Sequence, residues 1–280
     1  MGQLDGRVAL VTGATAKRGF GHATALRLAG EGADIVLVDK EERLPSLFTG
    51  DEEWGGLPEI VSEIKSLGKA AISVRADVTS SRDVASAVEK AVAKFGRIDI
   101  LVNCAGHPGK RETHIVKLGL VDWKTVLNVN LTGSFLVSRS VVRDMLRRGE
   151  GGAIVHLSSM RGKAGGIGNA GYVASKFGVI GLVQSMALEF AAANIRVNAI
   201  CPGFFITNFR DQWSEERGRA LGISTDEARN QCYEEWRKTV PLRRIGTPED
   251  VANLALFLVS DQSSYMTGQA ISLDGGLLMS

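Results

Sequence analysis

Short apolar runs alternate with longer segments of helical periodicity along the whole chain. The first two runs cover residues 8–11 and 35–38, and the later ones cover 70–74, 98–102, 153–157, 196–200 and 270–273. Because these runs are β-branched and apolar on both faces, they predict buried parallel strands. The segments between them predict amphipathic helices, over 23–29, 84–95, 122–146, 173–192 and 249–258.

This alternation predicts an α/β fold: a doubly wound parallel sheet with helices on both faces, formed by a single domain over residues 1–280. Two segments interrupt the rhythm. Residues 44–57 contain several glycines and indicate a surface insertion. Residues 208–240 contain their own helix signals, a capping box of Ser224 and Glu227 and an every-fourth-residue repeat of Ala228, Cys232 and Trp236, and we interpret this segment as a helical lid.

A glycine-rich turn follows the first predicted strand and precedes the first predicted helix. It contains Gly13, Gly19 and Gly21. Glycines at this place let the backbone turn tightly and approach a pyrophosphate, which lies at the helix N-terminus where free N–H groups point outward. Asp39 ends the second predicted strand, where a carboxylate accepts hydrogen bonds from a ribose. The context indicates a Rossmann-like dinucleotide site.

Two features of the turn and strand favour different cofactors. The carboxylate of Asp39 favours NAD, because it would repel the 2′-phosphate of NADP. Lys17 and Arg18 favour NADP, because cations in this loop can pair with that phosphate, and the adjacent Lys40 has the same sign. We give Asp39 more weight, since it occupies the ribose position while the loop cations have an easier place in water. The expectation is NAD, with NADP less favoured.

Tyr172 and Lys176 are four residues apart in a predicted helix and therefore share one face. A nearby ammonium favours the tyrosinate and lowers a tyrosine pKa, which makes Tyr172 a candidate general acid and base near neutral pH. Ser159 follows a predicted strand, where its hydroxyl would hold a substrate oxygen.

With these residues in place, the chain resembles the short-chain dehydrogenase/reductase family over nearly its whole length. The matching residues are Thr12-Gly13 with Gly19 and Gly21; Asp77-Val78; Asn103-Cys104-Ala105-Gly106; Asn128-Val129-Asn130; Ser158-Ser159; Tyr172 and Lys176; Pro202-Gly203 with Thr207; and Asp274-Gly275-Gly276.

The resemblance implies a role for each matching residue. Tyr172 would be the acid/base, Lys176 would lower its pKa and bind the nicotinamide ribose, Ser159 would orient the substrate oxygen, and Asn130 would hold a water. The implied cofactor-binding residues are Gly13, Arg18, Gly19, Phe20, Gly21, Asp39, Asp77, Val78, Asn103, Ala105, Gly106, Tyr172, Lys176, Pro202, Gly203, Phe205 and Thr207. Cys104 stands where an Asn is more usual.

One spacing departs from the family pattern. Five residues separate Gly13 from Gly19, where three are usual, and this resembles the enoyl-acyl-carrier-protein reductase branch. That branch places the active-site Lys seven residues after the Tyr, whereas here the separation is four. We therefore reject enoyl reduction and expect chemistry at an alcohol or carbonyl carbon.

Charge and composition exclude several other classes. The net charge of +2 gives no electrostatic case for nucleic acid. Three dispersed cysteines suit a cytoplasmic protein better than a disulfide framework, and no spacing indicates a metal site. No uninterrupted apolar run is long enough to span a membrane, and residues 1–7 do not have the pattern of a signal peptide.

Three functions remain open. The first is an NAD-dependent dehydrogenase acting on a small secondary alcohol, polyol or sugar-like substrate. The second is an NADPH-dependent carbonyl reductase, such as a 3-oxoacyl reductase, and the third is a nucleotide-sensing protein without catalysis. The intact set of Asn130, Ser159, Tyr172 and Lys176 argues against the third. The family resemblance and the apolar helices over 122–146 and 173–192 predict a homotetramer.

Overall fold

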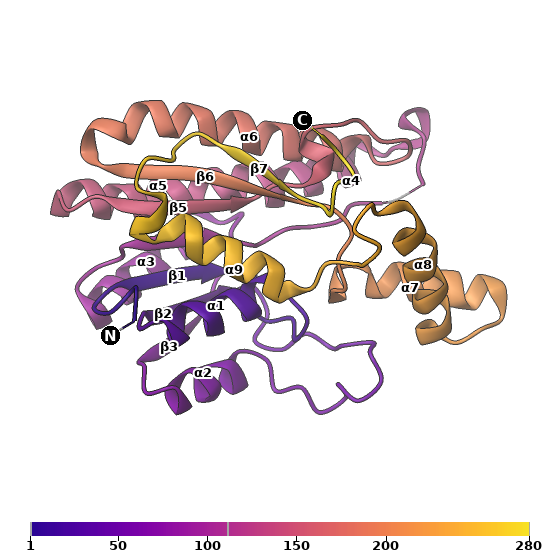
Figure 1. The fold of residues 1–280 in the computed structure, drawn as a ribbon, viewed down its shortest axis with the longest axis horizontal. Helices are drawn as coiled ribbons and strands as arrows, with labels where there is room; N and C mark the ends of the chain where they lie inside the picture. Colours follow the sequence, from indigo (N-terminus) through magenta and orange to yellow (C-terminus); the bar gives the residue numbers. More distant parts are fainter. Residues whose placement is uncertain (1, 111, 280) are drawn as a thin grey trace.

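The computed structural model describes residues 2–110 and 112–279, and its centre is a parallel sheet (Figure 1). Within these residues the sheet has seven strands in the order β3-β2-β1-β4-β5-β6-β7. The strands are β1 (Val8–Thr12), β2 (Asp34–Asp39), β3 (Ala71–Arg75), β4 (Ile100–Asn103), β5 (Gly152–Leu157), β6 (Ile195–Pro202) and β7 (Ala270–Leu273). The predicted doubly wound sheet is confirmed, and all seven predicted apolar runs form strands.

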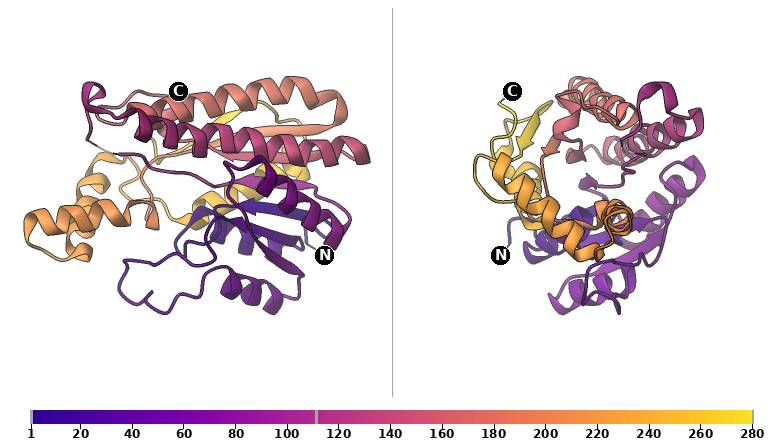
Figure 2. Two further views of the ribbon diagram at one scale, coloured as in Figure 1. Left: turned by 180° about the vertical axis from the view of Figure 1, so that it is seen from behind. Right: turned by 90° about the vertical axis from the view of Figure 1, so that its right-hand side faces the viewer.

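Helices cover both faces of the sheet, as the right-hand view of Figure 2 shows. One core lies between the sheet and three helices, α1 (Phe20–Gly30), α2 (Leu57–Ser66) and α9 (Pro248–Val259). The other core lies beneath α3 (Ser81–Phe95), α5 (Gly133–Arg148) and α6 (Ala170–Phe190). The inner strands β1, β2, β4, β5 and β6 are almost entirely buried because each face packs against apolar helix stripes, whereas the edge strands β3 and β7 are only partly buried.

The strand order reverses in the middle of the sheet, between the neighbouring strands β1 and β4. The chain adds β2 and β3 on one side of β1, and then adds β4 to β7 on the other side. The insertion and the lid helices α7 (Asp211–Leu221) and α8 (Thr225–Thr239) lie at the same end of the molecule, beyond the carboxyl ends of the strands (Figures 1 and 2). Ligands of open α/β sheets bind in the crevice at such a reversal point. The fold therefore places a candidate site at this end.

The helix expected over 122–146 is interrupted. It consists of α4 (Leu120–Leu127), a π-helical turn η2 (Asn128–Thr132) and α5. The helical periodicity continues through the break, so the apolar pattern does not reveal it. Single π-helical turns within α-helices often lie at functional sites, and this one contains Asn130.

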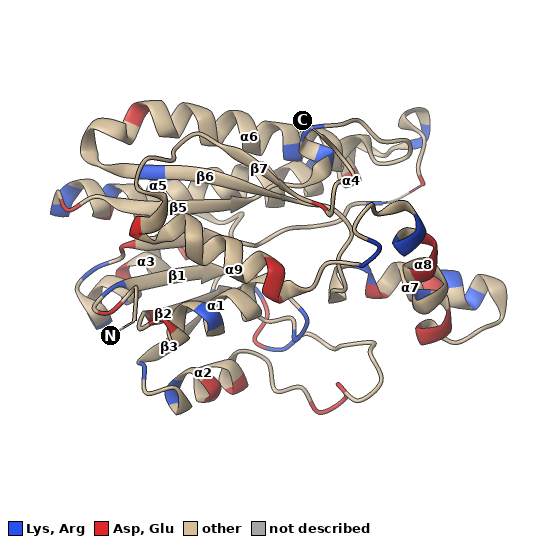
Figure 3. Cartoon of the chain, viewed as in Figure 1, with Lys and Arg blue, Asp and Glu red and all other residues tan. Residues whose placement is uncertain are grey.

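Helix α6 and the turn that follows it, residues 170–193, are long and apolar enough to cross a membrane by length and composition. The helix packs along the sheet and contributes Val179 and Val183 to a buried core. We interpret it as a core helix whose outer face is also apolar. Figure 3 shows that this helix carries very few charged residues, in contrast to α7 and α8.

Candidate active site

Tyr172 and Lys176 face the same cavity from the first turns of α6. The Lys176 ammonium nitrogen lies 5.7 Å from the centre of the Tyr172 ring and donates a hydrogen bond to the carbonyl oxygen of Leu157 at 2.7 Å. Burial lowers the pKa of Lys176 to about 8. The ammonium is therefore held rigidly beside the phenol, in the arrangement that favours a tyrosinate.

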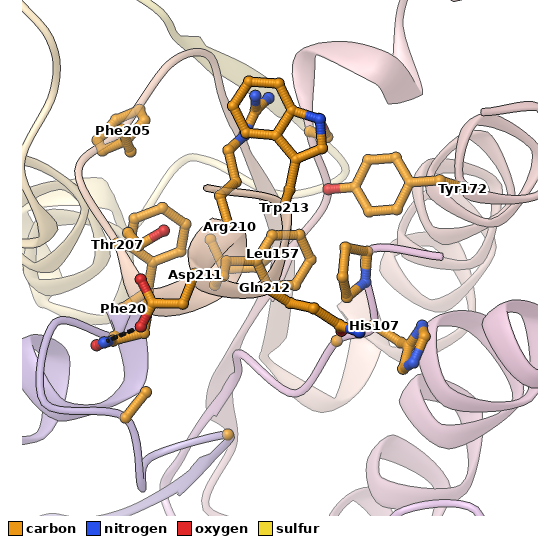
Figure 4. Close-up of a pocket in the computed structure, with 18 of the residues that line it drawn as sticks. Phe20, His107, Leu157, Tyr172, Phe205, Thr207, Arg210, Asp211, Gln212 and Trp213 are labelled. Carbon is orange, nitrogen blue, oxygen red and sulfur yellow. Dashed lines mark hydrogen bonds between the residues drawn. The ribbon is translucent and has the colours of Figure 1, made fainter. Parts of the chain in front are cut away.

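Ser159 enters the cavity from the loop after β5. Its hydroxyl oxygen accepts a hydrogen bond from the backbone N–H of Arg161 at 3.1 Å, which fixes the side chain. Ser159 and Tyr172 both line the cavity. Figure 4 shows the Tyr172 hydroxyl pointing into this space toward Trp213. Both residues are therefore placed to meet a ligand in the same cavity.

Asn130 is fully buried in the π-helical turn and does not line the cavity. Its amide nitrogen donates to the carbonyl oxygen of His107 at 3.1 Å and to the hydroxyl of Ser175 at 2.9 Å. Its amide oxygen accepts from the backbone N–H of His107 at 2.7 Å. Asn130 thus ties the loop after β4 to α6, one residue from Lys176.

A cavity of about 1230 Å³ extends from the glycine-rich turn to the lid. This exceeds the usual range for one small ligand, so it has room for a dinucleotide and a substrate. The expected cofactor-binding residues that line it are Gly13, Gly19, Phe20, Asp39, Asp77, Val78, Ala105, Gly106, Tyr172, Lys176, Pro202, Gly203, Phe205 and Thr207. Arg18, Gly21 and Asn103 do not line it.

The glycine-rich turn approaches the neighbouring loop closely. Gly13 has φ +65, and a Cβ there would lie 2.6 Å from the backbone nitrogen of Ala105. A Cβ on Gly21 would lie 2.4 Å from the carbonyl oxygen of Gly13. Only glycine fits at these two positions, which brings the helix N-terminus against the turn and leaves a bare backbone cradle of the kind that holds a pyrophosphate.

Asn103 supports this cradle from below. Its side-chain oxygen accepts a hydrogen bond from the hydroxyl of Thr12, and its nitrogen donates to Ser134 at 3.0 Å. The Thr12 hydroxyl in turn accepts the backbone N–H of Ala105 at 3.1 Å. Asn103 therefore joins β1, β4 and α5 beneath the cavity, and its contribution to a cofactor would be through the loop it holds.

Asp39 is held in a fixed orientation at the end of β2. Its two carboxylate oxygens accept the backbone N–H of Thr15 at 3.0 Å and that of Lys40 at 2.8 Å. The side chain lines the cavity, as the ribose-reading hypothesis requires. Lys40 is exposed and its ammonium lies 3.3 Å from a carboxylate oxygen of Asp77.

The substrate end of the cavity has an aromatic wall, which we define as Phe204, Phe209, Trp213 and Trp236. Phe204 and Trp236 stack with their ring centres 4.6 Å apart, and Phe209 lies 6.2 Å from the Tyr172 ring. The guanidinium of Arg210 stacks on Trp236 at 4.1 Å. All of this wall comes from the segment after β6.

The insertion packs against the lid. Asn208 donates from its side-chain nitrogen to the Ser46 hydroxyl at 2.8 Å and accepts the backbone N–H of Arg18 at 2.7 Å. Buried Arg229 donates to the carbonyl oxygen of Leu47 at 2.9 Å, pairs with Asp211 at 3.3 Å and stacks on the ring of Phe48. The glycine-rich turn, the insertion and the lid thus form one connected border of the cavity.

With the geometry described, comparison with known proteins identifies the family. The model of a protein family described as "Enoyl-(Acyl carrier protein) reductase" matches residues 13–278. A curated 3-oxoacyl-[acyl-carrier-protein] reductase of Thermotoga maritima is 41% identical over 278 residues, which are 99% of this chain and 100% of the relative. The chain belongs to the short-chain dehydrogenase/reductase family.

Other family members share the length and the fold. A 3-oxoacyl-[acyl-carrier-protein] reductase of Synechocystis is 36% identical over the whole of both chains. The crystal structure of carveol dehydrogenase from Mycobacterium avium in complex with NAD matches with a TM-score of 0.87 and 31% identity, covering 100% of both chains. An NAD⁺-bound xylitol dehydrogenase matches with a TM-score of 0.83 and 34% identity, covering 98% of this chain and 99% of the other.

In this short-chain dehydrogenase/reductase the histidines do not surround the chemistry. His22 packs on Trp54 and contacts the carboxylate of Glu63 at 2.7 Å, outside the cavity lining. His156 is a fully buried core residue. His107 lines the cavity, and burial lowers its pKa. Among the described residues no group of three His, Cys, Asp or Glu is placed to hold a metal ion.

Cys104 lines the cavity as an uncharged thiol, because burial raises its pKa to about 12. It therefore acts as a small packing residue. The loop cations differ from the expectation in one respect. Lys17 and Arg18 are partly exposed to water, as expected, but both also pair with Asp51, a buried carboxylate of the insertion. The sequence offered no periodic signal for this contact, because both partners lie in irregular loops.

Proposed function

We propose that this short-chain dehydrogenase/reductase interconverts a secondary alcohol and a ketone, with Tyr172 as the acid/base. The observation that carries the proposal is the arrangement of Tyr172 and Ser159 on one cavity, with the buried Lys176 ammonium 5.7 Å from the Tyr172 ring. A phenol supported in this way passes a proton to or from a substrate oxygen, which is worth about 10²–10⁴ in rate. Asn130 is the proposed positioning residue that holds the loop after β4 against α6.

The cavity residues fit a nicotinamide dinucleotide. Gly13, Gly19 and Gly106 leave bare backbone along the wall, and Asp39 faces the ribose end. When bound, the cofactor would supply the hydride acceptor or donor. The protein's part is to bind and orient: Asp77 and Val78 at the adenine, Lys176 at the nicotinamide ribose, and Pro202, Gly203 and Thr207 at the carboxamide.

We propose NAD as the preferred cofactor. Asp39 is oriented by two backbone N–H groups and lines the cavity, so a 2′-phosphate there would meet a carboxylate. Two solved relatives are described as bound to NAD or NAD⁺. NADP remains the second choice, since the expected 3-oxoacyl reductase alternative is an NADPH enzyme.

For the substrate, we propose a 3-oxoacyl thioester in preference to a polyol. The curated relatives are named 3-oxoacyl-[acyl-carrier-protein] reductases, which supports this alternative over the polyol or sugar-like substrate expected first. The aromatic wall supports it too, because an acyl or cyclic carbon skeleton would pack on those rings.

The second candidate is oxidation of a small secondary alcohol with NAD. Its support is the likeness to NAD-bound carveol and xylitol dehydrogenases. A single assay separates the two functions: NADH oxidation with acetoacetyl thioesters against NAD reduction with a panel of cyclic alcohols and polyols. Higher kcat/KM for the thioesters supports the first candidate, and turnover of alcohols alone supports the second.

We also propose that residues 1–280 form one domain with a lid over 208–240, acting in the cytoplasm as a homotetramer. The outer face of α5 and α6 exposes Phe135, Phe177 and Leu188, the last of them 85% exposed. Apolar side chains on the outside of core helices favour a second partner, and Met279 near the C-terminus is also exposed. Light scattering at micromolar protein tests the assembly, and a monomer mass would contradict it.

A further inference from the structure

The insertion places one buried carboxylate against both cations of the glycine-rich turn. Asp51 is 3% exposed. Its carboxylate oxygens accept hydrogen bonds from the Nε of Arg18 at 2.9 Å and from a terminal guanidinium nitrogen of Arg18 at 3.3 Å. The Lys17 ammonium nitrogen lies 3.0 Å from a carboxylate oxygen of Asp51. The Ser46 hydroxyl donates to the same carboxylate at 3.0 Å. These hydrogen bonds outweigh the effect of burial and lower the pKa of Asp51, so it is ionised near neutral pH.

This pairing turns both cations away from the cavity. Asp39, Lys40 and Glu41 line the ribose end, whereas Lys17 and Arg18 are absent from the lining. Phe48 holds Arg18 from a second side, with the guanidinium 4.4 Å from its ring centre. The residues that sequence alone favoured as ligands of a 2′-phosphate are therefore occupied elsewhere.

The other cations near Asp39 are occupied as well. Lys40 pairs with Asp77 at 3.3 Å. Arg75 donates to the carbonyl oxygen of Lys40 at 2.9 Å and faces Glu41. A 2′-phosphate bound here would meet Asp39 directly, with each nearby cation already facing a carboxylate of the chain.

We propose that Asp51 is a cofactor-selectivity residue, which favours NAD by holding Lys17 and Arg18 out of reach of the adenosine ribose. The inference rests on the proposed dinucleotide site and adds to it a second determinant outside the cavity. Asp39 would act by direct repulsion of the 2′-phosphate. Asp51 would act indirectly, by withholding the cations that would offset that repulsion.

The physical reason is competition for one pair of cations. A 2′-phosphate that recruited Arg18 would gain a charge-assisted, bidentate contact. The same movement would leave the buried, ionised Asp51 with Lys17 as its remaining cation, and withdrawing a partner from a buried charge is unfavourable. The phosphate would therefore have to compensate for the loss at Asp51 before any gain in affinity appeared.

The test uses cofactor fragments and the full-length protein, so it needs no substrate. Calorimetry measures the affinities of 2′,5′-ADP and 5′-AMP for wild type and for Asp51→Asn, which keeps the shape of the side chain and removes its charge. We expect the ratio of 2′,5′-ADP affinity to 5′-AMP affinity to rise at least about tenfold in the variant, equivalent to about 1.4 kcal/mol.

Glu52→Gln is the matched control. It removes one negative charge from the neighbouring position of the insertion, where the carboxylate accepts the backbone N–H of Gly50 and contacts neither loop cation. The ratio should stay within about threefold of wild type. An equal rise of the affinity ratio in this control would overturn the inference. The effect of Asp51→Asn would then be explained by the loss of any negative charge from the insertion.

A second set of variants, at the two cations, tests the inference even if Asp51→Asn folds poorly. Lys17→Ala with Arg18→Ala should leave the fragment ratio of the wild-type background unchanged, since Asp51 already holds both cations. When the same two changes are added to Asp51→Asn, the ratio of 2′,5′-ADP affinity to 5′-AMP affinity should return to the wild-type value. A tenfold loss of 2′,5′-ADP affinity in the wild-type background would show that the cations reach the phosphate despite Asp51, and would overturn the inference.

The outcomes also separate this inference from the proposed cofactor preference. A wild type that binds 2′,5′-ADP more tightly than 5′-AMP would contradict both. A wild type that favours 5′-AMP, combined with a folded Asp51→Asn variant of unchanged ratio, would contradict the role of Asp51 and leave the NAD preference supported. Circular dichroism and thermal unfolding of each variant establish that it is folded.

Discussion

The ammonium nitrogen of Lys176 lies 5.7 Å from the centre of the Tyr172 ring and is anchored by a 2.7 Å hydrogen bond to the carbonyl oxygen of Leu157. The anchor comes from the end of β5, so the sheet and α6 together fix the distance between the two side chains. Because the ammonium is buried, its charge acts on the phenol with little screening by water. The relationship leads directly to a test of the proposed chemistry.

Tyr172→Phe should lower kcat by about 10²–10⁴-fold, the usual worth of a general acid/base. The ring and its packing against Phe209 are preserved, so dinucleotide affinity should stay near that of wild type. Steady-state kinetics and NADH fluorescence titration measure the two quantities. Turnover close to wild type in the folded variant would remove Tyr172 from the mechanism.

Asp39→Ala should reduce the preference for NAD over NADP, which we expect to be at least about tenfold in kcat/KM for wild type, or about 1.4 kcal/mol. The change removes the carboxylate that would face the 2′-phosphate, while the backbone N–H groups of Thr15 and Lys40 lose their acceptor. Initial rates with both cofactors give the ratio. Equal use of both cofactors by the wild-type enzyme would contradict the weight given to this residue.

Closing of the lid should change tryptophan fluorescence when a substrate joins the cofactor complex. Trp213 and Trp236 line the cavity and would lose water contact on closure. Trp54 is already buried, at 3% exposed, and provides a constant background. The change should disappear in a Trp213→Phe, Trp236→Phe double variant. No change in wild type, in a ternary complex confirmed by calorimetry, would indicate a static lid.

His156 should make the protein less stable in acid. Burial, and then the charge of Lys176, lower its pKa from 6.5 to about 4. Nε2 contacts the Ser138 hydroxyl at 2.9 Å and Nδ1 faces the amide nitrogen of Asn103 at 3.3 Å. Because that amide nitrogen is a donor, Nδ1 must accept, and the ring is neutral in the folded state.

The sign follows from proton binding. Between pH 6.5 and 4 the unfolded chain binds a proton at His156 and the folded chain does not, so the free energy of unfolding falls as the pH is lowered through this window. The full loss, about 3 kcal/mol, is reached below about pH 4. Urea unfolding of wild type and His156→Gln measures it. The variant should lose less stability than wild type over this range, and parallel pH curves would contradict the prediction.

The strands and most helices were predictable because each depends on a pattern that is local in the sequence. The apolar runs predicted all seven strands, and the capping signal at Ser224 predicted α8, where the Ser224 hydroxyl accepts the backbone N–H of Glu227 at 3.1 Å. The π-helical turn around Asn130 was missed because it leaves the periodicity of the flanking helices unchanged. Ligand and substrate roles of the cavity residues stay predictions.

The sequence by itself determined the order of strands and helices, the glycines of the phosphate cradle, and the spacing that puts Tyr172 and Lys176 on one face. These features depend on backbone conformation and periodicity, which neighbouring residues encode. Only the tertiary structure decided where Lys17 and Arg18 point. Their partner, Asp51, lies on an irregular loop about 33 residues farther along. A contact between loops is set by how the surrounding elements pack, and no local pattern records it.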